Sequence, residues 1–98
     1  MDKLLEQVNK NFPLAKNALA VIESEELLIL ELSQYIQELI DTDFSKLVNT
    51  LYRIDVSETK IKKALQNCQP QESNKVIARL IIEREKQKIK TREEYKKP

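Results

Sequence analysis

The chain has 98 residues and a formal net charge of +1, with 34% charged and 41% hydrophobic residues. Glycine and histidine are absent and there is one cysteine. These absences exclude glycine-rich phosphate loops, histidine-based nucleophile pairs and zinc sites built from cysteine and histidine. The composition predicts a single all-α domain over residues 1–98, a compact bundle of four to six helices with a long C-terminal helix.

Three predicted helices occupy the N-terminal part, at about 2–11, 14–22 and 25–41. Phe12 precedes Pro13, which disfavours helical backbone and places a break there. Ser24 can cap a new helix whose first turn is acidic. Since neither glycine nor proline enforces that second break, residues 14–41 could also form one continuous helix.

The helix over 25–41 carries the widest apolar stripe, which predicts a central helix covered on more than one side. Its members are Leu28, Ile29, Leu32, Tyr35, Ile36, Leu39 and Ile40, widened by Leu27 and Leu30.

Two shorter helices follow at about 44–53 and 58–67, joined by a sharp turn. The first has an apolar face at helical spacing, made by Phe44, Leu47, Val48, Leu51 and Tyr52. Ser57 is the predicted N-cap of the second. We expect Ile61, Ala64, Leu65 and Cys68 to form the buried face of that second helix.

The last predicted helix spans about 71–94, with Pro70 in its first turn and apolar residues up to Ile82. Beyond Ile82 the sequence is mostly lysine, arginine and glutamate. Lysines 86, 88 and 90 point around the helix, which favours a solvated face or a dimer arm over a nucleic-acid stripe. This part therefore either projects past the core or lies along another subunit.

Charge is distributed unevenly along the chain. Residues 1–45 hold three lysines against nine acidic residues, a net −6, and residues 46–98 hold fourteen basic against seven acidic residues, a net +7. We favour an arrangement in which the two halves face each other, within one subunit or across a dimer. The alternative is that the basic half meets an anionic partner.

A partial helix-turn-helix pattern covers residues 47–66, and V-S-E-T-K-I-K-K-A-L (56–65) resembles the recognition-helix openings of bacterial repressors. That resemblance implies DNA contacts by Thr59, Lys60, Lys62 and Lys63. Two positions depart from the motif: Asp55 replaces the usual glycine in the turn, and Leu51 replaces a small residue in the first helix. We therefore favour the simpler interpretation, two helices joined by a capped turn with solvated lysines.

No catalytic, cofactor or metal site emerges from the sequence. Acid-base chemistry needs two carboxylates that converge in a pocket, and the pairs Glu31/Glu38 and Asp41/Asp43 show no such convergence. We expect no enzyme activity, no cofactor and no small-molecule substrate.

The stretches T-D-F-S-K-L-V-N-T-L-Y-R-I-D-V-S-E (42–58) and L-I-I-E-R-E-K-Q-K-I-K-T-R-E (80–93) resemble small uncharacterised all-helical bacterial proteins. This resemblance implies a helical cytoplasmic protein and no assigned activity. A cytoplasmic location also fits the single cysteine, the missing signal-peptide pattern and the lack of a bilayer-length apolar run, so we expect no membrane partner. The leading hypothesis is a non-enzymatic interaction module that self-associates or binds another protein. DNA binding through 58–67 is the alternative.

Overall fold

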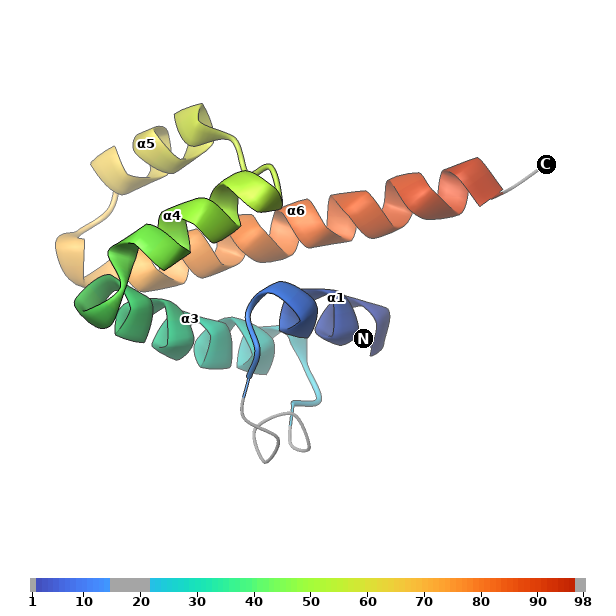
Figure 1. Cartoon of the computed structure of the whole chain (residues 1–98), viewed down its shortest axis with the longest axis horizontal. Helices are drawn as coiled ribbons and strands as arrows, with labels where there is room; N and C mark the ends of the chain where they lie inside the picture. Colours follow the sequence, from blue (N-terminus) through green and yellow to red (C-terminus); the bar gives the residue numbers. More distant parts are fainter. Residues whose placement is uncertain (1, 15–21, 97–98) are drawn as a thin grey trace.

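The computed structural model describes residues 2–14 and 22–96, and within them the protein is all-α. These residues form five α-helices and one short 3₁₀ turn, with no strand (Figure 1). The elements are α1 (Asp2–Asn11), α3 (Glu25–Thr42), α4 (Phe44–Arg53), α5 (Glu58–Gln66), η1 (Pro70–Glu72) and α6 (Ser73–Lys96). The predicted fold class, a helical bundle with a long C-terminal helix, is confirmed.

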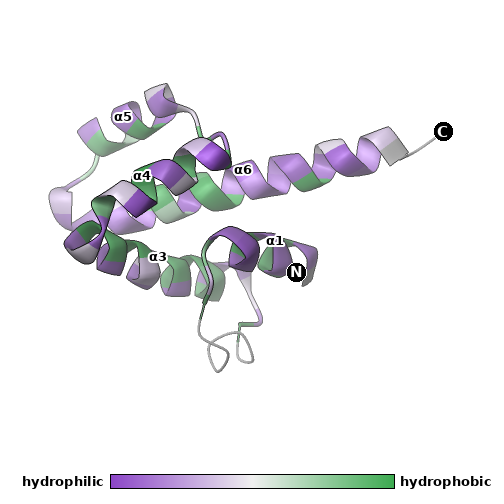
Figure 2. Ribbon diagram, in the orientation of Figure 1, coloured by the Kyte–Doolittle hydropathy of each residue, from purple (hydrophilic) through white to green (hydrophobic). Residues whose placement is uncertain are grey.

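Helix α6 holds the bundle together. It makes extensive contacts with α3 and α1 and further contacts with α5, whereas α4 packs on α3. The C-terminal part of α6 projects past the other helices (Figure 1). Figure 2 shows why: the apolar residues of α6 gather beside the other helices and its C-terminal part is largely hydrophilic.

The core collects one apolar stripe from each of α1, α3, α4 and α6. Phe12, at the end of α1, is fully buried and meets the ring of Tyr35 edge-on, with ring centroids 6.2 Å apart. The buried apolar residues are Leu4, Val8, Phe12, Ile22, Leu28, Leu32, Ile36, Leu39, Leu47, Leu51, Ile54, Ile77, Ala78, Ile81 and Ile82.

Local capping fixes where the helices begin. The Ser24 hydroxyl accepts a hydrogen bond from the Leu27 N–H at 3.2 Å, so α3 starts anew at Glu25. Asp43 caps α4 in the same way, through the Lys46 N–H at 3.1 Å. The predicted helix over 14–22 falls on residues 15–21, which lie outside the described part, and its flanking residues Leu14 and Ile22 are not helical.

The predicted burial of α5 is wrong, whereas the predicted covering of α3 on more than one side is confirmed by its contacts with α6 and α4. No residue of α5 is buried, and Leu65 is 36% exposed, because α5 rests on α6 by one edge instead of inserting into the core. Cys68 lies beyond the end of α5 and is only half-buried. On α3, Leu27 and Leu30 are each 42% exposed, so the apolar stripe is wider than the surface that the other described helices cover.

Candidate functional site: an apolar groove between α4 and α5

The turn after α4 sets the geometry of this region. Asp55 has a φ of 61°, in the left-handed region, directly after the helix. The Val56 N–H donates to the Leu51 carbonyl and the Asp55 N–H donates to the Tyr52 carbonyl, both at 3.1 Å. This pair of hydrogen bonds defines a Schellman motif, which normally has glycine at the left-handed position. Aspartate tolerates this backbone better than most residues, so the turn forms without glycine.

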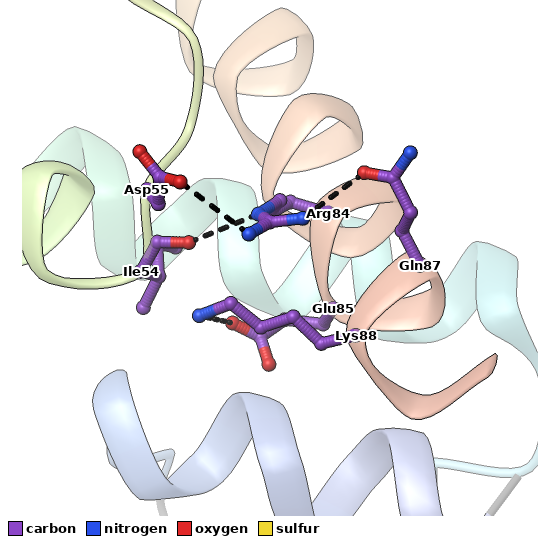
Figure 3. A network of polar contacts seen from close by, with 6 residues as sticks. All are labelled: Ile54, Asp55, Arg84, Glu85, Gln87 and Lys88. Carbon is purple, nitrogen blue, oxygen red and sulfur yellow. Dashed lines mark hydrogen bonds and ion pairs between the residues drawn. The ribbon is translucent and has the colours of Figure 1, made fainter. Parts of the chain in front are cut away.

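Arg84 of α6 ties this turn to the bundle (Figure 3). Its Nε donates to the Ile54 carbonyl at 3.2 Å, which satisfies a carbonyl that the helix end leaves without a partner. A second nitrogen of the guanidinium group lies 3.5 Å from Asp55 Oδ2, and a third donates to Gln87 at 3.1 Å. The start of α5 is therefore held at a fixed position relative to α6.

An open apolar groove results on the other side of the turn, with a volume of about 220 Å³. Helix α4 forms one wall, α5 forms the other, and Ile77 of α6 contributes to the lining. The apolar lining residues are Phe44, Leu47, Val48, Leu51, Tyr52, Val56, Ile61, Leu65 and Ile77.

Aromatic side chains stand exposed along this groove. Phe44 is 59% exposed and Tyr52 is 66% exposed, although both belong to the apolar face of α4. The charged lining residues are Glu58 and Lys62 of α5, whose side chains form an ion pair at 3.8 Å. The groove therefore presents apolar surface to solvent with one acid and one base at its edge.

The four candidate DNA-contacting residues all lie on the short helix α5. Thr59, Lys60, Lys62 and Lys63 are all exposed on α5. Lys62 borders the apolar groove, whereas Lys60 borders a separate polar hollow of about 370 Å³ together with Asp55 and Arg84. The chain reverses direction between α4 and α5 (Figure 1). Leu51, the departure from the motif in the first helix, lines the groove between them.

Sequence reasoning missed a buried carboxylate, Glu85 of α6. Glu85 is 0% exposed, and no hydrogen bond of standard geometry from the described residues reaches either carboxylate oxygen. Lys88 lies one turn away with its Nζ 4.0 Å from Glu85 Oε1, and both side chains lie on the side of α6 that faces α1 (Figure 3). The missed signal is spacing, since Ala78, Ile81, Ile82 and Glu85 follow one helical stripe.

Burial raises the pKa of Glu85 above its ordinary value, because removal from water penalises the ionised form. Lys88, the side chain of Gln7, Arg84 and Arg92 act in the opposite direction without cancelling the rise. The carboxyl group is therefore a source of instability at neutral pH.

The predicted surface acids have local structural roles. Asp41 accepts a hydrogen bond from Gln37 at 3.1 Å, and Asp43 caps α4. Across residues 2–14 and 22–96, no group of three or more cysteine, aspartate or glutamate side chains is placed to hold a metal ion.

Comparisons with family models, with curated proteins and with solved structures gave no match to this chain. Among the helices that the structure describes, none combines the length and the hydropathy needed to cross a membrane.

Proposed function

We propose that this protein is a non-enzymatic helical interaction module of the cytoplasm, and that it binds a polypeptide in the groove between α4 and α5. The polypeptide is either a second copy of the chain or another protein. The observation that carries the proposal is the apolar groove flanked by the exposed rings of Phe44 and Tyr52.

General energetics support this assignment. Exposed apolar surface that is gathered in one place marks binding sites more often than scattered apolar residues do. Aromatic residues are also enriched at the centres of protein interfaces, where they supply most of the binding energy. A groove between two helices is a common receptor for an amphipathic helix. The free thiol of Cys68 fits a reducing compartment.

Site-specific photo-crosslinking tests the proposal. A benzophenone amino acid replaces Phe44, which lines the groove, is 59% exposed and is itself aromatic. Irradiation of the protein in cells and after purification should give a covalent adduct with a polypeptide. The adduct should disappear when Tyr52→Glu is added, because a charge on the groove wall opposes apolar docking.

The matched control places the same benzophenone at Gln37, an exposed residue of α3 away from the groove. It should give no adduct that depends on Tyr52. If position 44 gives no adduct that Tyr52→Glu removes, the proposal is wrong.

DNA binding through α5 is a second candidate, favoured by the exposure of Thr59, Lys60 and Lys63 and by the left-handed turn at Asp55. Titration into a labelled random-sequence duplex at two salt concentrations tests it. Phosphate contacts predict binding that weakens steeply as salt rises.

Lys60→Glu combined with Lys63→Glu should abolish that binding while circular dichroism stays unchanged. Absence of binding at low salt, or binding that survives both substitutions, would exclude this second function.

A further inference from the structure

We infer that the groove between α4 and α5 binds the same groove of a second copy, so that the chain forms a two-fold symmetric dimer. This inference rests on the proposed function and names its partner. In such a dimer each copy places its Tyr52 ring against the apolar lining of the other, as an isologous interface requires.

The patch has the shape that self-pairing needs. It combines a hollow with exposed apolar side chains, because two of the rings that line the groove are more than half exposed. Phe44 and Tyr52 are eight residues apart on α4, so they stand two turns apart along one face. A two-fold axis over this face brings the projecting rings of each copy to the hollow of the other.

The charges at the groove are self-complementary. Glu58 and Lys62 lie one turn apart on α5 and are the charged side chains in the groove lining. A two-fold axis between them pairs Glu58 of one copy with Lys62 of the other, and the reverse pair forms at the same time. The remaining lining is apolar, so no unpaired charge needs to be buried.

The exposed area indicates a weak dimer. A large aromatic side chain buries about 150–250 Å², and Phe44 and Tyr52 leave 59% and 66% of theirs exposed. The rings and Leu65 therefore supply about a third of the roughly 800 Å² per partner that a specific interface buries. The interface therefore falls below that standard size, as weak and transient complexes do. We expect the dimer to dissociate into monomers when the protein is diluted to low micromolar concentrations.

Sedimentation equilibrium from about 1 to 500 µM tests the inference on the full chain. The wild type should pass from monomer to dimer across this range. Tyr52→Glu should weaken dimerisation at least about tenfold, as loss of a central aromatic does. Asn49→Glu adds the same charge to an exposed position of α4 outside the groove lining and should leave the association unchanged.

A charge exchange tests the symmetry. Glu58→Lys and Lys62→Glu should each weaken dimerisation, because each places like charges opposite one another across the axis. A 1:1 mixture of these two variants, or the double variant, should recover dimerisation because opposite charges then face again. Circular dichroism verifies that each variant is folded.

A protein that stays monomeric at 500 µM, or a dimer that Tyr52→Glu does not weaken, would overturn the inference. Failure of the mixture to recover would overturn the two-fold pairing. A groove-dependent crosslink to a different protein, with no self-association, would contradict the inference and leave the proposed function standing.

Discussion

Glu85 shows how one side chain can oppose the fold that surrounds it. It continues the stripe of Ala78, Ile81 and Ile82, and it is as fully buried as they are. The periodicity of the sequence predicts this position to face inward, but the residue type favours a solvated face. Packing of α1 against α6 decides the outcome, and the carboxylate is buried beside Gln7 and Lys88.

Replacing Glu85 by glutamine should stabilise the protein at pH 7. Since the folded-state pKa is raised above the unfolded value, stability is highest below the unfolded pKa and falls as pH rises through the folded pKa. Glu85→Gln removes the charge and should raise the free energy of unfolding by about 1–2 kcal/mol at pH 7. Urea denaturation at pH 7 and at pH 4 measures the effect.

The gain should shrink toward pH 4, because protonation removes the charge from the wild-type side chain. Glu83→Gln, two residues earlier and exposed, should change stability little at either pH. A destabilised Glu85→Gln variant at pH 7 would show that the ion pair with Lys88 outweighs the cost of burial.

Asp55 allows a test of backbone conformation, because its backbone is strained. At a φ of 61° a β-branched residue is disfavoured by about 1–2 kcal/mol, whereas asparagine is tolerated. Asp55→Val should therefore lower the free energy of unfolding by about that amount, and Asp55→Asn should leave it within about 0.5 kcal/mol. Thermal unfolding of the three proteins compares them. Equal loss in both variants would assign the effect to the contact with Arg84 instead of the backbone.

Among the elements, the limits of α4 and α5 could be predicted because they depend on local chemistry. Asp43 and Ser57 cap the two helices, and each cap needs only a residue three positions along the chain. Burial of α5 could not be predicted in this way. The spacing of Ile61, Ala64 and Leu65 identifies an apolar face, but whether a partner helix covers it depends on where α6 and α4 lie.

The groove also depends on where α4, α5 and α6 lie relative to one another. The apolar lining residues of α4 and α5 could be identified from helical spacing, but as core. An open groove arises because α5 contacts α6 and leaves the apolar face of α4 partly uncovered. This arrangement of α5 relative to α4 belongs to the tertiary structure, and it is fixed by the turn at Asp55 and by the contacts of Arg84.

An element with no buried residue should open more easily than the rest. At low micromolar protein concentration, backbone amides of α5 should exchange with deuterium faster than those of α3, whose buried stripe must be exposed before it opens. Ser57→Ala removes the cap that accepts the Lys60 N–H at 3.3 Å. It should cost α5 about 0.5–1 kcal/mol of local stability and speed its exchange further.

Thr59→Ala, on the same helix but outside the cap, should not speed that exchange. Equal protection of α5 and α3 would contradict the loose packing of α5.

At the scale of the whole molecule, the contrast between acidic and basic halves does not organise the bundle. Lys86 and Glu25 pair across the halves at 3.0 Å, but Lys3 and Glu93 pair in the reverse sense at 2.7 Å. The other ion pairs that join described residues, Glu58–Lys62, Asp55–Arg84 and Glu85–Lys88, lie within the basic half. The two halves do face each other within one subunit, because α1 and α3 pack on α6 and α4 packs on α3. Of the two ion pairs between described residues that join the halves, one has the predicted sense and the other has the reverse sense.

Stability should depend little on salt. The pairs Lys3–Glu93 and Lys86–Glu25 are solvent-exposed, and such pairs contribute about 0–1 kcal/mol each. Raising sodium chloride from about 0.05 to 0.5 M, which screens exposed charges, should change the free energy of unfolding by less than about 1 kcal/mol. Urea denaturation at both concentrations measures it. A larger loss would show that charge pairing between the halves contributes substantially to stability.

The position of α6 also determines when the protein can fold during synthesis. Helices α1, α3 and α5 all pack on a helix that begins at Ser73 and ends at Lys96. On the ribosome, these earlier helices emerge before the surface that covers them has been translated. A nascent chain that stops before Ser73 lacks the residues of α6 that complete the core. A stalled or truncated translation product therefore exposes apolar stripes that chaperones and proteases recognise.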